Sequence, residues 1–197
     1  AYEIMPSLVG LGDVYKRQYL DLEEITRKDT YAECAVRKYS GDDPDVTGGM
    51  LVFARVEKTG GSDPAEPRVV IEGGSGVGRV TRPGLEQAIG QAAINQVPRR
   101  MIRDGVLEMC EQYGYSGNIK VTVSVPGGEE TAKKTFNPRL GIVGGISILG
   151  TSGIVRPYSH EAYIATIRIC VRSTRLSGFR KAVFCTCLLY TSDAADE

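Results

Sequence analysis

The feature that most constrains the fold of this chain is the run from Ser124 to Pro157, in which glycines and prolines separate short apolar pieces. Glycine serves where the backbone takes a positive φ or approaches another group closely, whereas proline fixes φ and stops helices. A segment of this composition consists mostly of turns. The run therefore predicts a shaped backbone surface.

Two further blocks accompany this run, GDDPDVTGG from Gly41 to Gly49 and EGGSGVGRVTRPGLEQAIGQAAINQVPRRMI from Glu72 to Ile102. In sequence, order and spacing the three blocks resemble the CbiD family, the cobalt-precorrin-5B C1-methyltransferases of anaerobic cobalamin biosynthesis. The departures are small: Gly48 stands where a larger residue is common, and Gln96 where the family often has proline. Neither removes a group that could do chemistry.

The resemblance covers roughly residues 19–187, the middle of the family. Residues 1–18 and 188–197 fit no part of it, and we expect both to be non-native sequence that resembles translated sequencing adapter. The opening segment of the family and about its C-terminal half have no counterpart here. We expect an α+β domain over residues 19–125, followed over residues 126–187 by the glycine-rich block and the start of a truncated α/β domain.

The composition is that of an ordinary globular protein, with 197 residues of which 42% are hydrophobic and 24% charged. The two end segments hold five acidic and two basic residues, which leaves 22 basic and 19 acidic residues, a net charge of +3. This charge is too small to indicate nucleic-acid binding, but it suits a small anionic ligand. No run of 18 apolar residues is present, and the five cysteines form no disulfide pattern, so we expect a cytoplasmic protein with reduced thiols and no membrane partner. The sequence makes no prediction of the oligomeric state.

Apolar periodicity predicts the secondary structure. Strands are expected over Tyr31–Ser40, Met50–Glu57, Arg68–Ile71, Asn118–Val125 and Ala182–Thr186. One helix should have Pro98 in its first turn, and a second should be capped by Ser159 and end at Gly178. The apolar stripe of the first helix would be Ile102, Val106, Cys110 and Tyr113, and that of the second Tyr163, Ile167, Cys170 and Val171. Strands and helices alternate, but the strand around Val121 has a polar face, which favours a mixed α+β and α/β fold.

The glycine clusters fit no nucleotide-binding motif. The segment Gly145–Ser152 has the spacing of a P-loop but carries Thr151 in place of lysine, and Arg79 stands where the third glycine of a dinucleotide fingerprint belongs. Phosphoryl transfer is therefore the weakest hypothesis. Two interpretations remain, namely turns that allow close packing or a backbone cradle for a cofactor or a substrate carboxylate. The cradle candidates are Gly73, Gly74, Gly76, Gly78, Gly144, Gly145, Gly150 and Thr151.

Asp42, Asp43 and Asp45 form the densest acidic cluster and are the catalytic candidates. Neighbouring carboxylates raise one another's pKa, and a carboxylate can also bind ribose hydroxyls. The alternative is that they cap turn backbone together with Thr47. The single histidine, His160, is interpreted as a surface residue at a helix start.

The resemblance implies S-adenosylmethionine as methyl donor and cobalt-precorrin-5B as acceptor, with methylation at C1 giving cobalt-precorrin-6A. The sulfonium is already activated, so the chemistry requires neither a protein nucleophile nor a protein-bound metal. The alternative is a domain that only binds the corrinoid intermediate, while the missing half supplies the donor site.

The acceptor implied by the resemblance carries many acetate and propionate groups, so its site needs cationic donors. The candidates in or beside the three blocks are Arg79, Arg82, Arg99, Arg100, Lys133, Lys134, Arg139 and Arg156. For any one of them, a solvated surface position is the alternative.

Overall fold

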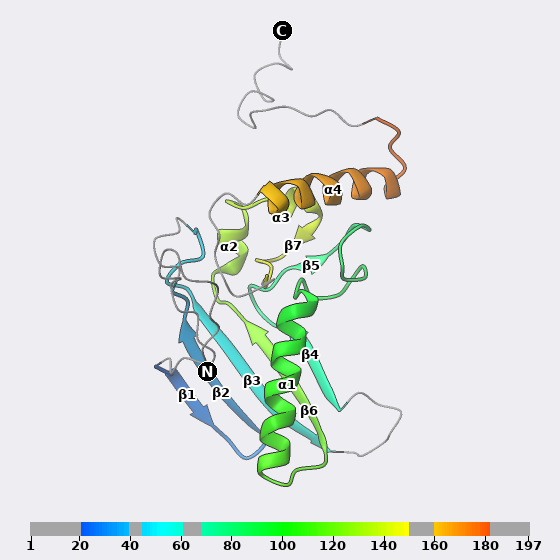
Figure 1. Cartoon of the computed structure of the whole chain (residues 1–197). Coiled ribbons are helices and arrows are strands. Elements are labelled where there is room, and N and C mark those ends of the chain that lie inside the picture. Colours follow the sequence, from blue (N-terminus) through cyan, green and yellow to red (C-terminus); the bar gives the residue numbers. More distant parts are fainter. Residues whose placement is uncertain (1–20, 40–44, 61–67, 150–159, 182–197) are drawn as a thin grey trace, which may run out of the picture.

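A computed structural model describes residues 21–39, 45–60, 68–149 and 160–181 (Figure 1). Several predictions from the sequence lie outside these ranges. They concern the strand at 182–186, the helix cap at Ser159, and the candidate site residues Asp42, Asp43, Gly150, Thr151 and Arg156.

The main structural unit is a five-stranded sheet in the order β1-β2-β3-β6-β4. Its strands are β1 (Glu23–Arg27), β2 (Tyr31–Arg37), β3 (Leu51–Gly60), β4 (Val69–Gly73) and β6 (Asn118–Ser124). Neighbouring strands are antiparallel except β4 and β6, which are parallel. The sheet is therefore mixed, and together with its helices it confirms the mixed α and β fold expected from the sequence.

The core lies on one face of the sheet because β6 alternates as its sequence predicts. Ile119, Val121 and Val123 are each at most 5% exposed, whereas Lys120 and Thr122 point to the other face and are half-buried. In the register, Val121 stands beside Val56 of β3 and Ile71 of β4. Apolar side chains from three strands thus form one continuous surface.

Helix α1 (Gln96–Gln112) covers part of this apolar face (Figure 1). It begins at Gln96, two residues before Pro98, which lies in its first turn. Of the predicted stripe, Cys110 is buried, and Ile102 and Val106 pack against the core. The expectation for Tyr113 was wrong: this side chain is 77% exposed. The helix has ended at Gln112, and the positive φ of Gly114 turns the chain away, so the stripe does not continue.

A smaller unit follows at one end of the sheet. It contains the antiparallel pair β5 (Arg79–Val80) and β7 (Ile142–Val143) and the short helices α2 (Gly128–Ala132) and α3 (Asn137–Leu140). Val80, Ala93 and Ile142 form its own buried cluster. The glycine-rich run, predicted to be mostly turns, thus also contains two short helices and one strand in its described part. Glycine ends two of these elements, since Gly141 follows α3 and Gly144 follows β7.

Helix α4 (His160–Leu176) lies beyond this unit, and Gly178 follows it with a φ of +87°. A glycine in this conformation is the predicted helix end. Of the predicted apolar stripe, Ile167 is half-buried, whereas Cys170 and Val171 (39%) are exposed, so the prediction was wrong for these two; the side chain of Tyr163 lies outside the description. Within the described residues, no helix has the length and apolar character needed to cross a membrane.

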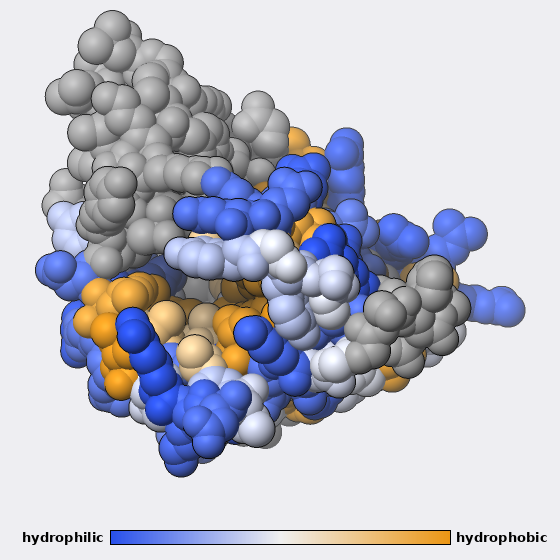
Figure 2. Space-filling model, turned by 90° about the horizontal axis from the view of Figure 1, so that it is seen from below, coloured by the Kyte–Doolittle hydropathy of each residue, from blue (hydrophilic) through white to orange (hydrophobic). Residues whose placement is uncertain are grey.

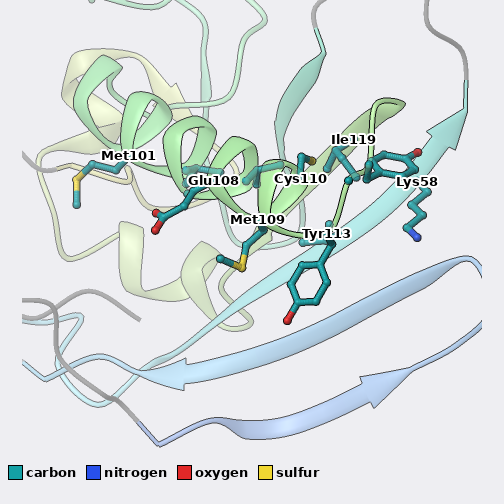
Figure 3. A pocket seen from close by; sticks show the side chains of 13 residues that line it. Lys58, Met101, Glu108, Met109, Cys110, Tyr113 and Ile119 are labelled. Atoms are coloured by element: carbon teal, nitrogen blue, oxygen red, sulfur yellow. The ribbon is translucent and has the colours of Figure 1, made fainter.

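An open groove of about 660 Å³ lies between α1 and β3. Figure 2 shows a hollow lined by hydrophobic side chains when the molecule is seen from below. In Figure 3, Met109 and Tyr113 extend from α1 on the side of the sheet that carries β1 and β2. The groove is lined by none of the predicted site residues.

Candidate functional site at the glycine-rich end of the sheet

The parallel strands β4 and β6 end at the same edge of the sheet, and a glycine-rich segment follows each of them. Gly73 to Gly78 continues from β4, while Val125 to Gly128 continues from β6. The two segments are hydrogen-bonded, since the N–H of Gly74 donates to Val123 (2.8 Å) and that of Val125 to Ser75 (2.8 Å). The second and third family blocks therefore meet here.

A later part of the third block also joins this contact. Gly76 accepts a backbone hydrogen bond from Ile146 (2.9 Å), and Gly78 donates one to the Ile146 carbonyl (2.8 Å). A Cβ on Gly76 would lie 1.8 Å from the Val125 carbonyl oxygen, and one on Gly145 would lie 2.3 Å from the Gly76 oxygen. Only glycine permits such an approach of three backbones, and Gly76 also has a φ of +70°.

The first block lies next to the third. A Cβ on Gly127 would be 3.9 Å from the methyl carbon of Met50, the residue that directly follows Gly49. The three blocks, which are separated along the chain, thus converge at one end of the sheet. We take this end as the candidate functional site.

The predicted cradle glycines differ in how closely the protein surrounds them. The amides of Gly74, Gly76 and Gly78 all donate within the protein, that of Gly76 to the Glu129 carboxylate at 2.9 Å. Gly73 is equally enclosed, because a Cβ there would lie 2.7 Å from Ala92. Gly144 differs, since no atom lies within 4 Å of its added Cβ. The closed positions favour the close-packing interpretation, and donor binding by any of these glycines stays a prediction.

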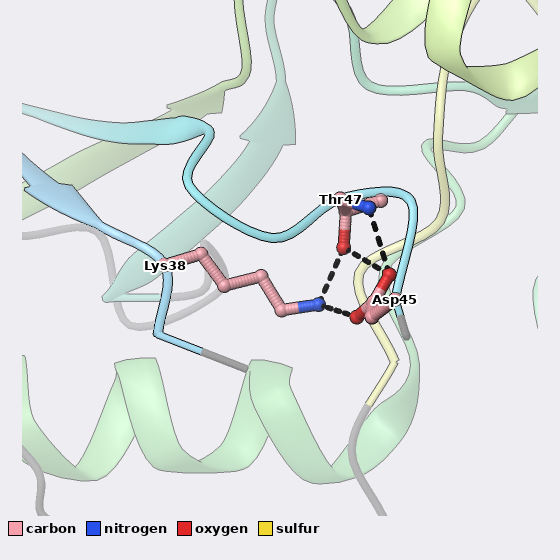
Figure 4. A network of polar contacts seen from close by, with 3 residues as sticks. All are labelled: Lys38, Asp45 and Thr47. Atoms are coloured by element: carbon pink, nitrogen blue, oxygen red, sulfur yellow. Dashed lines mark hydrogen bonds and ion pairs between the residues drawn. The ribbon is translucent and has the colours of Figure 1, made fainter. Parts of the chain in front are cut away.

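Asp45 caps a turn in the first block (Figure 4). Its Oδ1 accepts hydrogen bonds from the N–H (2.8 Å) and the hydroxyl (2.7 Å) of Thr47, and its Oδ2 is paired with the ammonium of Lys38. Burial raises the pKa of Asp45, but the hydrogen bonds from Lys38 and Thr47 outweigh it and hold the pKa below its ordinary value. This geometry is the turn-capping alternative, and a catalytic role for the aspartates stays a prediction.

No pattern in the sequence had indicated that Lys38 takes part in this turn. It lies before the loop and reaches Asp45 because the two ends of the loop pair: the N–H of Lys38 donates to Met50 (2.9 Å), and that of Gly49 to Lys38 (2.9 Å). Only the pairing of β2 with β3 brings the ammonium to the carboxylate.

Arg99 is the most constrained of the predicted cations. Its guanidinium donates to three backbone carbonyls, those of Ile94 (2.9 Å), Ile71 (3.0 Å) and Ala92 (3.2 Å). Burial, with a smaller contribution from the nearby Arg103, lowers its pKa from the ordinary value. Arg99 thereby ties the start of α1 to β4, and its planar fork is used within the fold.

The other described cations lie at the surface. Arg79 donates to Gly90 (3.1 Å), Arg82 donates to the Arg139 carbonyl (3.4 Å), and Lys133 pairs with Glu130 (2.7 Å). The exposed side chains of Arg100, Lys134 and Arg139 have no hydrogen-bond or ion-pair partner among the described residues. All but Arg100, which lies on α1, belong to the small unit of β5, α2, α3 and β7 or flank its elements, so the fold gathers cations at the glycine-rich end.

The comparisons with known proteins agree with these blocks. The sequence model of the CbiD family matches residues 12–157. This chain belongs to the CbiD family. The match begins within the first 18 residues, whose assignment as non-native sequence stays a prediction.

Curated relatives of this CbiD chain carry the name cobalt-precorrin-5B C(1)-methyltransferase. The protein from Pseudomonas syringae pv. tomato is 52% identical over 171 residues, which are 87% of this chain and 45% of the relative. That from Ruminiclostridium cellulolyticum is 55% identical over 151 residues, 77% of this chain and 38% of the relative. The chain therefore spans less than half the length of these relatives.

A solved structure supports the fold. The cobalamin biosynthesis protein CbiD of Archaeoglobus fulgidus superposes with a TM-score of 0.50 at 35% sequence identity, covering 74% of this chain and 45% of the other. The described residues of this CbiD chain contain no group of three or more His, Cys, Asp or Glu side chains placed to hold a metal ion.

Proposed function

We propose that this chain is part of a cytoplasmic cobalt-precorrin-5B C(1)-methyltransferase that uses S-adenosylmethionine and forms cobalt-precorrin-6A in anaerobic cobalamin biosynthesis. The observation that carries the proposal is the 52% identity, over 87% of the chain, to a relative of that name. The reaction is proposed for a protein of the relatives' length, because this chain spans 45% of that relative.

The reaction is a transfer of a methyl group from sulfur to carbon. An electron pair at C1 of the macrocycle forms the new C–C bond as the C–S bond of the sulfonium breaks, and a neutral thioether leaves. Since the donor is already activated, the protein has to align the two carbon atoms and exclude water.

We propose that the cations at the glycine-rich end bind the carboxylates of the acceptor. Arg82 and Arg139 carry this proposal best, because both are exposed and neighbouring, with 3.4 Å between the Arg82 guanidinium and the Arg139 carbonyl. Arg99 plays a different part, since its three bonds to carbonyls maintain the edge on which the other cations stand.

The donor fits the described residues less well. A cradle for the donor requires free backbone N–H groups, yet those of Gly74, Gly76 and Gly78 are donated within the protein. This observation favours a second candidate function, in which this chain binds the corrinoid intermediate and the rest of a longer protein holds the donor.

Methyl transfer from isotopically labelled S-adenosylmethionine to cobalt-precorrin-5B under anaerobic conditions tests the first proposal. The chain is assayed beside a chimera in which residues 12–157 replace the matched region of the Pseudomonas syringae relative, and that relative is the positive control. Label in the macrocycle with the chimera supports the proposal, whereas a folded chimera that gives none overturns it. Donor binding by this chain alone, measured by calorimetry, would overturn the second candidate.

A further inference from the structure

The groove between α1 and β3 is apolar along most of its length. Its walls come from both layers of the fold, the helix and the sheet (Figure 3). Apolar side chains that line it include Val56, Met101, Ile102, Met109, Tyr113 and Ile119, and the charged side chains of Lys58 and Glu108 also border it. Met109 is 46% exposed and Tyr113 77% exposed, although both line the groove (Figure 3).

The width of the sheet explains why the groove exists. A helix is about 10 Å across, and neighbouring strands lie about 4.8 Å apart, so one helix covers about two strands. α1 packs on β4, and its Cys110 shares one core with the buried inward residues of β4 and β6. On the same face, Cys34 of β2 and Val52 and Ala54 of β3 are only half-buried. Within the part of the chain that the structure describes, the helices therefore cover only part of the apolar face, and no described helix lies over the remainder.

Gly105 is a second, independent indication. It lies in the middle of α1, where glycine is the least favourable residue apart from proline, and it lines the groove. Its φ is not positive, so no special backbone conformation requires a glycine there. A small residue on a helix face allows another helix to approach closely, because the distance between two helix axes depends on the side chains at the contact.

We propose that this groove is the docking site of an amphipathic α-helix supplied by the part of the CbiD protein that lies outside this chain. The relatives are long enough, since more than half of the Pseudomonas syringae protein falls outside the matched region. From Met101 to Tyr113 the groove follows α1 for about 18 Å at the helical rise, so the helix needs about twelve residues. Its apolar stripe lies on the half-buried strands, with its smallest residues against Gly105. The proposal rests on family membership and does not depend on the methyl-transfer reaction.

The test uses Gly105→Leu in this chain and in the chimera described above. In this chain, leucine improves helix propensity and adds an apolar side chain to the groove wall, so the urea midpoint rises. In the chimera, the same side chain projects into the docked helix, so the midpoint falls. Asp104→Leu is the matched control, because Asp104 is exposed and outside the groove, and its shift keeps the same sign in both proteins. Shifts of equal sign for Gly105→Leu overturn the proposal.

Alkylation of Cys34 in the unsubstituted proteins gives a second measurement that needs no mutant to fold. We expect at least a tenfold slower reaction in the chimera, with the modified residue located by mass spectrometry. Equal rates overturn the proposal. It is also overturned if this chain alone sediments as a dimer that Gly105→Leu dissociates, because a second copy would then fill the groove.

Discussion

At the residue scale, the glycine-rich end shows that two glycines of similar φ carry different constraints. Gly76 and Gly144 have φ values of +70° and +76°. A side chain at Gly76 would meet the Val125 carbonyl at 1.8 Å, whereas Gly144 has open space around it. Both glycines thus have a positive φ, but only Gly76 also lacks space for a side chain.

Gly76→Ala should therefore prevent folding, while Gly144→Ala should lower the free energy of unfolding by only about 1–2 kcal/mol, the strain of a left-handed non-glycine residue. Circular dichroism and urea denaturation of both variants check this. A Gly76→Ala protein as stable as Gly144→Ala would contradict the packing shown here.

Arg99→Lys should destabilise the protein by about 1–3 kcal/mol, because one ammonium cannot reach three carbonyls and leaves at least one without a donor. The exposed neighbour Arg100 gives the control, for which Arg100→Lys should stay within about 0.5 kcal/mol of the wild type. Urea denaturation of the two variants measures the difference. Equal stabilities would mean that the three contacts do not hold α1 to the sheet.

The turn at Asp45 predicts a pH dependence of stability. The folded state lowers the pKa of Asp45 below its ordinary value of 3.8, so its stabilising contribution is present above pH 3.8 and is lost as the pH falls through the folded-state pKa. The stability difference between wild type and Asp45→Asn should therefore shrink on acidification. Denaturation curves from pH 6 to pH 2 measure it, and Lys38→Met should reduce the same dependence. A difference that stays constant with pH would contradict this account.

At the scale of elements, α4 comes close to the loop after β5 at Gly84. Gly84 has a φ of +112°, and a Cβ there would lie 2.9 Å from the backbone of Ser173 in α4. A side chain at position 84 would therefore displace α4.

Gly84→Ala should thus release α4 while the sheet stays folded. Hydrogen exchange should show faster exchange over residues 160–176 and unchanged protection of β3 and β6. Gly90→Ala in the same loop is the control, because Gly90 also has a positive φ but no atom within 4 Å of an added Cβ. Equal loss of α4 protection in both variants would argue against the contact.

At the scale of the whole molecule, exposed cations gather at the glycine-rich end, where we propose that the acceptor binds. Arg82 and Arg139 lie at the glycine-rich end, whereas Arg27 lies away from it, since the pairing of β1, β2 and β3 places Arg27 level with Val56 in the middle of β3. If the glycine-rich end binds a polycarboxylate, its cations should contribute more to the affinity than cations elsewhere.

We expect Arg82→Gln combined with Arg139→Gln to weaken cobalt-precorrin binding at least tenfold, which corresponds to about 1.4 kcal/mol. Arg27→Gln should leave affinity unchanged, and added salt should weaken the wild type more than the double variant. Equilibrium titration with the chimera measures these affinities. If the double variant and Arg27→Gln weaken binding equally, the carboxylates of the acceptor bind elsewhere.

Features that short stretches of residues encode could be predicted from the sequence. The alternation of β6, the helix near Pro98 and the glycine that ends α4 follow from local periodicity and backbone preference, and the three blocks were enough to indicate the family. Each of these depends on residues close together in the chain, so no knowledge of the path between elements is needed.

The candidate site, in contrast, is built from contacts between residues that are far apart in the chain. Arg99 bonds to Ile71, 28 residues away, and Gly76 touches Val125 and Gly145 because two parallel strands end at one edge of the sheet. The pairing of Lys38 with Asp45 and the groove beside Gly105 likewise depend on which elements become neighbours. The sequence specifies each residue, but contacts between distant residues depend on the path of the chain. These contacts occupy the glycine amides and the Arg99 guanidinium that had been predicted to bind ligands.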